Sequence, residues 1–241
     1  MTIKLEKLNN KTHQKIKVMP DGIHQHNANL HMCHLSLEEI NLAAQYYPIL
    51  FAKDTDTGQF QPIALFGLNV DENIYQQMNI WQKCYLPLKL ASQPFFLTKT
   101  ANDTPELAIN MNDPRVQANK GQAVFNGLEA SQYLNQQAQC LSDLSKGFIL
   151  NEIFVKELLA VELIEPLTLD ITYNDGKQHK LTGLYSINRE NLEKVAPSTQ
   201  QQFADKGYVE LIHNMLGSLT HINTLIELSN QHSVANTALT E

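Results

Sequence analysis

Residues 49–66 read Ile-Leu-Phe-Ala-Lys-Asp-Thr-Asp-Thr-Gly-Gln-Phe-Gln-Pro-Ile-Ala-Leu-Phe, and this stretch decides the fold. Two apolar runs, 49–52 and 62–66, flank a polar connection whose Asp and Gly residues suit the dihedral angles of a tight turn. Neither run alternates with polar positions, which is typical of strands that are covered on both faces. The stretch therefore predicts a central, doubly buried β-hairpin.

Two further hairpins are predicted from paired strand patterns. Their strands are residues 94–98 with 107–111, and residues 167–173 with 179–187. The second pair is joined through Asn174-Asp175-Gly176, which is a strong turn signal between alternating strands. An earlier alternation at 12–18 predicts one more half-buried strand.

Helical periodicity fills most of the remaining chain. Ser36 predicts a helix start as an N-cap, with Glu38 and Glu39 favoured in the first turn by the helix dipole, and this helix ends before Pro48. Gly147 predicts an interruption of the long helical stretch, because glycine suits a C-cap. The other predicted helices span 131–165, 188–195, 197–207 and 208–228, and Asn188 is the predicted N-cap of the second of these.

Antiparallel hairpins separated by runs of helix, without alternating βαβ units, predict an α+β fold with helices packed against an antiparallel sheet. No internal repeat or Gly/Ser linker divides the chain, so a single domain over 1–241 is expected. Residues 1–11 and 229–241 are expected to be loosely ordered.

Composition limits the possible partners and location. The net charge of the 241 residues is −7 and the 18 Lys and Arg residues are scattered, so nucleic acid is not expected as a partner. The three cysteines are widely spaced, which is typical of a reducing compartment. Neither a signal peptide nor an apolar run of about 20 residues is recognised, so we expect a cytoplasmic protein with no membrane span.

One segment combines aromatic rings, prolines and an acidic-amide triplet, and it holds the only tryptophan. Because aromatic walls recognise apolar or peptide ligands, this segment is the candidate ligand- or partner-binding surface. Its residues are Asp71, Glu72, Asn73, Trp81, Tyr85, Pro87, Pro94 and Phe95. The same pattern is also typical of rings that pack in a core, and of an Asp71 side chain that caps a helix running from Glu72 toward Trp81.

Four of the nine histidines are close together in the sequence, at His24, His26, His31 and His34. Imidazoles at these spacings can share a metal ion. The surrounding sequence is polar and loop-like and has no carboxylate from His24 until Glu38, which favours a solvent-exposed histidine loop instead. The sequence therefore predicts no metal site and no cofactor, with these histidines as weak candidates.

Residue patterns typical of catalysis are missing. Ser218 near His213 and His221 is the best formal nucleophile with a base, but helical spacing explains it and no nucleophile elbow precedes it. The segment 121–127 has two glycines but lacks the Lys-Ser or Lys-Thr of a phosphate loop. These observations favour a non-catalytic protein.

Ordered motifs run along nearly the whole chain. They are residues 44–54, Gly67-Leu68, Glu72-Asn73, Trp81 with Tyr85 and Pro87, Pro94-Phe95, residues 121–126, residues 181–187, and Gly207, Leu211 and Ser218-Leu219. On these residues the chain resembles the bacterial SapC family, which is named after a component of a surface-array locus. The resemblance implies a link to cell-surface systems, an S-layer or outer-membrane receptors, and it implies no reaction.

Two hypotheses of function result. The first is a non-catalytic accessory protein that binds a protein or peptide partner through the aromatic surface around Trp81. The alternative is an enzyme or small-molecule binding protein with a pocket beside Trp81. The sequence does not set the oligomeric state.

Overall fold

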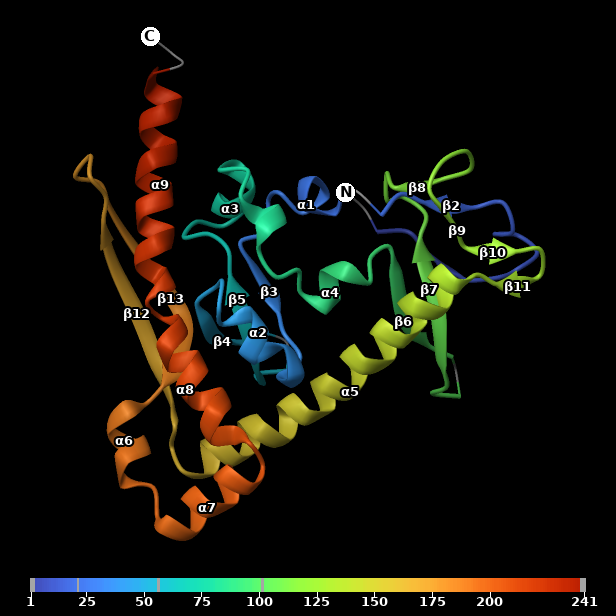
Figure 1. Ribbon diagram of the computed structural model, residues 1–241. Coiled ribbons are helices and arrows are strands. Elements are labelled where there is room, and N and C mark those ends of the chain that lie inside the picture. Colours follow the sequence, from blue (N-terminus) through green and yellow to red (C-terminus); the bar gives the residue numbers. More distant parts are fainter. Residues whose placement is uncertain (1–2, 21, 56, 101, 239–241) are drawn as a thin grey trace. The chain divides into compact units, whose positions relative to one another are not determined.

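The computed structural model describes residues 3–20, 22–55, 57–100 and 102–238. Its fold is α+β, with antiparallel sheets and helices packed against them, as the sequence predicts (Figure 1). The chain forms two compact units. Unit 1 comprises Met1–His26 and Leu88–Lys146, and unit 2 comprises Asn27–Pro87 and Gly147–Glu241. The single domain over 1–241 stays a prediction.

Unit 2 contains a five-stranded antiparallel sheet in the order β12-β13-β4-β5-β3. Its strands are β3 (Met32–His34), β4 (Ile49–Lys53), β5 (Phe60–Leu65), β12 (Ile164–Thr172) and β13 (Gln178–Ile187). The central hairpin is confirmed, since Leu50 of β4 pairs with Ile63 of β5 and both side chains are fully buried. Loss of apolar surface from water on both faces stabilises this pair of strands.

The β12–β13 hairpin is also confirmed, and it joins the central hairpin at one end. Leu184 and Tyr185 of β13 pair with Ala52 and Phe51 of β4. Ile171, nearer the other end of the ribbon, is buried although no further strand pairs there. Figure 1 shows the long ribbon with α9 beside it, and the backbone N–H of Asn174 donates to Oδ1 of Asn230 in α9 at 2.9 Å.

Helices of 3 to 18 residues belong to unit 2 together with this sheet. They are η1 (Leu37–Glu39), α2 (Ile40–Ala43), α3 (Ile74–Gln77), η2 (Trp81–Lys83), α6 (Arg189–Lys194), α7 (Pro197–Asp205), α8 (Tyr208–Ser218) and α9 (His221–Ala238). Ser36 and Asn188 precede η1 and α6 as predicted N-caps, and the Asn188 side chain accepts from the backbone N–H of Asn191. The single helix predicted over 208–228 is wrong, because α8 ends at Ser218 and α9 begins at His221.

Unit 1 contains smaller antiparallel sheets. Their strands are β1 (Leu5–Lys7), β2 (Lys17–Val18), β6 (Phe95–Lys99), β7 (Pro105–Asn110), β8 (Val116–Gln117), β9 (Gln122–Ala123), β10 (Phe125–Asn126) and β11 (Glu129–Ala130). Pairing of β6 with β7 confirms the predicted hairpin. Two short helices, α1 (Ile23–His26) and α4 (Leu88–Ala91), also belong to this unit.

Regular elements occur near both ends of the described chain, and the loose order of 1–11 and 229–241 stays a prediction. Residues 5–7 form β1, which pairs with β7 through its backbone. At the other end α9 continues past the predicted limit of residue 228 to Ala238, and Ser229, just beyond that limit, is buried. The strand predicted over 12–18 is shorter, because only residues 17–18 form ladder hydrogen bonds.

The interruption predicted at Gly147 is wrong, because α5 (Gln132–Ala160) is continuous. Gly147 lies inside the helix, where an added Cβ would stand 2.4 Å from Cβ of Ser36. This glycine therefore permits a close approach of α5 to the start of η1 within unit 2, rather than ending a helix.

Two glycines inside helices should respond in opposite ways to alanine. Gly147→Ala should lower the free energy of unfolding by about 1–3 kcal/mol, because the new methyl group overlaps Ser36. Gly217→Ala in α8 should raise it by about 0.5–1 kcal/mol, since nothing lies within 4 Å of its added Cβ and alanine favours the helix. Urea unfolding followed by circular dichroism measures both, and equal effects would contradict the close contact.

Candidate functional site

Most of the predicted aromatic surface is interior. Trp81 is 1% exposed and Phe95 and Asn73 are fully buried. Pro87 and Pro94 are buried as well, while Asp71 is exposed and Glu72 and Tyr85 are half-buried. The Trp81 ring is therefore part of the core, and binding by the other residues of this set stays a prediction.

Trp81 belongs to a buried hydrogen-bond network centred on the hydroxyl of Tyr47. The Trp81 Nε1–H donates to the Tyr47 hydroxyl at 3.0 Å, and this hydroxyl donates to the carbonyl of Tyr85 at 2.6 Å. Phe66 packs against both rings, with centroids 4.8 Å from Tyr47 and 5.3 Å from Trp81. The aromatic concentration in the sequence thus builds a core in unit 2.

The network continues to a buried carboxylate. The Tyr85 hydroxyl donates to Oε1 of Glu39 at 3.0 Å, and Glu39 is 2% exposed. Its other oxygen accepts from the backbone N–H and the hydroxyl of Ser36, at 2.9 and 2.6 Å. Glu39 therefore satisfies the free N–H at the start of η1, as the third residue of a capping box does.

Burial sets the ionisation of this core. It raises the pKa of Tyr47 far above its usual range, and it raises the pKa of Tyr75, whose ring contacts Tyr47. Burial also raises the pKa of the Cys84 thiol, although a hydrogen bond with Tyr47 opposes this shift. Neutral phenol and thiol groups at ordinary pH fit a structural role better than nucleophilic chemistry.

The acidic-amide triplet shapes a loop. Asn73, not Asp71, is the N-cap of α3, and its Oδ1 accepts from the backbone N–H of Gln76 at 3.1 Å. Glu72 accepts from the backbone N–H groups of Leu68 and Asn69, both at 3.2 Å. The triplet therefore does cap a helix, as the alternative interpretation predicts. The capping residue is Asn73 rather than Asp71, because the helix begins after residue 73.

Pro94 and Phe95 belong to unit 1. Phe95 begins β6 and packs edge-on against Tyr133 of α5, with ring centroids 5.8 Å apart. The structure brings Trp81 and Tyr85 into one network in unit 2, and it gives Phe95 a core position of its own.

The histidine segment is not one loop. His24 and His26 lie in α1 of unit 1, whereas His34 ends β3 of unit 2 and His31 precedes that strand. Nε2 of His26 lies 3.7 Å from the carboxylate of Asp113. Among the residues that the structure describes, no three His, Cys, Asp or Glu side chains are grouped so as to hold a metal ion.

Ser218 has structural partners. Its hydroxyl donates to the carbonyl of Met215 at 2.6 Å and accepts from the backbone N–H of Ile49 at 2.9 Å. Nε2 of His221 lies 3.1 Å from the carbonyl of Ala44. The Ser218 bond attaches the end of α8 to β4, and the His221 contact attaches the start of α9 to the end of α2.

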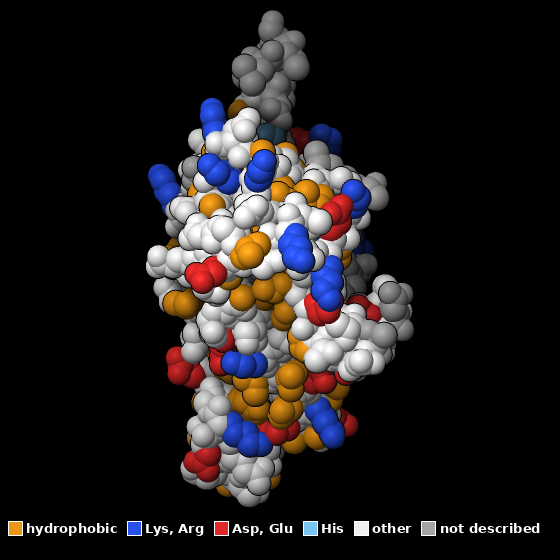
Figure 2. All heavy atoms as spheres, turned by 90° about the vertical axis from the view of Figure 1, so that its right-hand side faces the viewer, with side chains coloured by type: hydrophobic (Ala, Val, Ile, Leu, Met, Phe, Trp, Pro, Cys, Tyr) orange, Lys and Arg blue, Asp and Glu red, His pale blue; other side chains and the backbone are white. Residues whose placement is uncertain are grey.

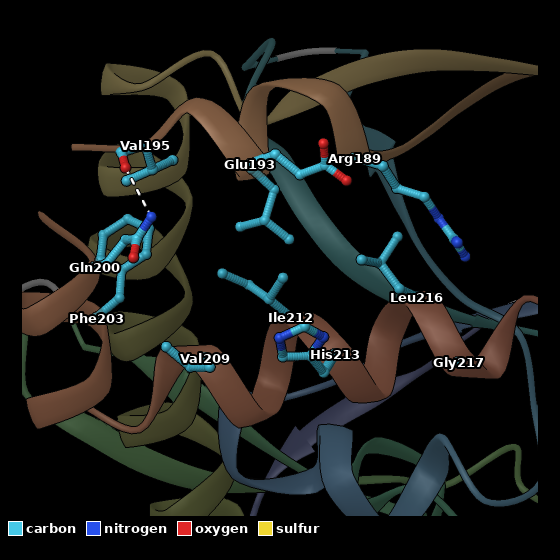
Figure 3. A pocket seen from close by; sticks show the side chains of 11 residues that line it. Arg189, Glu193, Val195, Gln200, Phe203, Val209, Ile212, His213, Leu216 and Gly217 are labelled. Carbon is cyan, nitrogen blue, oxygen red and sulfur yellow. Dashed lines mark hydrogen bonds between the residues drawn. The ribbon is translucent and has the colours of Figure 1, made fainter. Parts of the chain in front are cut away.

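A groove that the sequence analysis missed lies between α6, α7 and α8. It encloses a cavity of about 570 Å³. Its apolar lining comes from Leu192, Val195, Phe203, Val209, Ile212 and Leu216, and its polar lining from Arg189, Glu193, Gln200 and His213. Figure 3 shows Ile212 and Leu216 pointing from α8 toward α6, with Phe203 at one end and Arg189 and Gly217 at the other.

The two ends of the groove differ. At the Phe203 end, Nε2 of Gln200 donates to the carbonyl of Val195 at 2.8 Å and closes the wall. At the other end Gly217 has no Cβ, and Arg189 and Glu193 form no ion pair with another described residue. The groove is therefore closed and apolar at one end, and open and charged at the other.

A signal for this groove exists in the sequence. Besides the face formed by Leu211, Met215 and Leu219, residues 208–218 carry Val209, Ile212 and Leu216 on other sides of the helix. A helix that is apolar over more than one face must have more than one apolar neighbour.

Fold and groove together define an α+β protein with an apolar helical groove. No helix in the described part of the chain is long and apolar enough to cross a membrane. The SapC family model matches residues 8–225, so the chain belongs to the SapC family. Comparison with curated proteins and with solved structures gave no match.

Removal of the Tyr47 hydroxyl should weaken the core. Tyr47→Phe should lower the free energy of unfolding by about 1–3 kcal/mol, because it takes away the acceptor of the Trp81 N–H and the donor to the Tyr85 carbonyl. Tyr46→Phe is the control, since this neighbouring ring is 37% exposed. Equal stability losses in the two variants, measured by urea unfolding, would count against the network.

The same tyrosines predict the response to alkali. Tyr47 and Tyr75 have pKa values raised above those of the unfolded chain, so above about pH 10 the unfolded state loses protons first and stability falls. Each group contributes a slope of up to about 1.4 kcal/mol per pH unit. Unfolding measured from pH 8 to 11.5 should show a shallower fall for Tyr47→Phe than for the wild type.

Proposed function

We propose that this SapC-family protein is a non-catalytic accessory protein that binds a protein or peptide partner in the groove between α6, α7 and α8. The concave apolar lining of the groove is the observation that carries the proposal. Anchoring side chains of a partner gain most of their binding free energy where a pocket removes them from water.

The rim supports a protein or peptide as the partner. Arg189, Glu193 and His213 place charged or titratable groups beside the apolar floor. An apolar centre with a polar rim is the usual organisation of a protein interface. Val209 is 36% exposed at the groove, so α8 offers apolar surface that its own fold does not cover.

The groove takes the role that the sequence gave to the aromatic segment. Trp81 is a core residue, whereas Asp71, Glu72 and Tyr85 keep exposed or partly exposed surface, and a contact through them stays a prediction. The link to an S-layer or outer-membrane receptor, implied by the family resemblance, and a cytoplasmic location also stay predictions.

A small apolar molecule is the second candidate occupant. The cavity volume of about 570 Å³ is within the range of small-molecule pockets, about 300–1,000 Å³. This candidate keeps the alternative of a ligand-binding protein but places the ligand in the groove rather than beside Trp81. A helix-sized partner is favoured because the groove is open at the Gly217 end.

Site-specific photo-crosslinking tests the proposal. A benzophenone side chain at His213, inside the groove, should give a discrete protein adduct in cells, whereas the same group at exposed Thr224 on α9 should not. Val209→Glu should remove the adduct by placing a carboxylate in the apolar lining. Adducts of equal yield at both positions, or an adduct that survives Val209→Glu, would contradict binding in the groove.

A further inference from the structure

The outer side of α5 in unit 2 carries an uncovered apolar ridge. Ile149, Leu150 and Ile153 are 59%, 37% and 46% exposed and lie within about one turn of the helix. Figure 2 shows hydrophobic side chains gathered at the height of the C-terminal half of α5, with charged side chains around them. Contiguous exposed apolar side chains of this kind mark interaction sites.

The ridge faces away from the core of its own unit. Phe154, one turn along from the Leu150 edge of the ridge, is fully buried and packs against Tyr208 of α8 with ring centroids 4.8 Å apart. Leu158 is fully buried on the same inner side. The ridge and the groove therefore occupy different surfaces of unit 2, and one copy can use both at once.

Two opposite charges flank the ridge one helical turn apart. Glu152 and Lys156 are exposed, and neither forms an ion pair with a described residue. In the groove, Arg189 and Glu193 have the same spacing on α6, the reverse order of charge, and no ion pair of their own. The two surfaces are thus complementary in polarity and charge order.

We infer that the ridge of one copy of this chain inserts into the groove of a second copy. α5 of the first copy runs parallel to α6 of the second, so Glu152 meets Arg189 and Lys156 meets Glu193. Ile149 and Ile153 enter the apolar lining. This inference rests on the proposed function and names its partner as a second copy.

Such a contact is heterologous, because it joins two different surfaces. Each bound copy still offers a free ridge or a free groove, so association continues into a ring or an open chain of copies. A symmetric contact between two α5 ridges would instead stop at a dimer and would not involve Arg189 or Gly217.

Charge exchange tests the pairing. The purified full chain should associate with rising concentration in sedimentation velocity experiments. Arg189→Glu and Glu152→Arg should each weaken association at least about tenfold, because like charges then face each other. An equimolar mixture of the two variants should regain association, since each groove finds a ridge of opposite charge. Lys194→Glu is the control, because Lys194 lies on the same helix but pairs with Glu190 outside the groove lining. It makes the same change of charge as Arg189→Glu and should leave association unchanged.

Blocking variants test the direction of the contact. Gly217→Trp should fill the open end of the groove without meeting other atoms near its Cβ, and Ile153→Asp should disable the ridge. Each variant alone should fail to form long assemblies, while their mixture should stop at a dimer. Gly217→Ala should associate like the wild type and shows that α8 tolerates substitution.

Three results would overturn the inference. They are a wild type that stays monomeric, a Gly217→Trp variant that associates like the wild type, and a mixture of the two charge variants that does not regain association. The proposed function is separable from it. A monomeric wild type that still gives a groove adduct with a different protein at His213 would reject self-association and keep partner binding. Loss of both the adduct and the association would reject both.

Discussion

The hydroxyl of Tyr47 is the constraint on which the core of unit 2 depends. It receives a hydrogen bond from the Trp81 indole and donates one to the Tyr85 carbonyl, so segments far apart in the sequence share one buried polar atom. A buried polar group without such partners would cost about 1–3 kcal/mol. The requirement fixes the position of the 81–85 segment relative to the start of β4, because Tyr47 lies two residues before that strand.

The same network explains why Trp81, in the most recognisable part of the sequence, is a core residue. Trp81, Tyr85 and Pro87 are combined in one short segment because that segment must bury a ring, satisfy its N–H and pass on to α4. A pattern of aromatic residues and prolines is the same for a core as for an exposed wall. Only the presence of Tyr47 and Glu39 as partners, 34 and 46 residues away, distinguishes the two.

Local sequence patterns predict most helices and strands correctly. They do not predict features that depend on contacts between residues far apart in the sequence. The three hairpins and the caps at Ser36 and Asn188 follow from turn chemistry and short-range hydrogen bonds, and the structure has them. Gly147 is the opposite case. The local pattern predicts a helix end there, whereas the structure needs glycine because Ser36, 111 positions earlier, lies close to its Cα. The groove was not predicted for the same reason. Its walls come from α6, α7 and α8, and the concavity exists only when these helices are placed together.

One wall of the groove is α6, which makes few buried contacts with the rest of unit 2. α6 has only six residues and none of them is buried. Hydrogen bonds hold its first turn, from the Asn188 N–H to the Leu163 carbonyl and from the Asn191 side chain to the Glu162 carbonyl, both at 2.9 Å. Elements with few buried apolar contacts open at low free-energy cost. An occupant that packs against Leu192 supplies apolar contact that α6 lacks, and its binding and the order of α6 are therefore coupled.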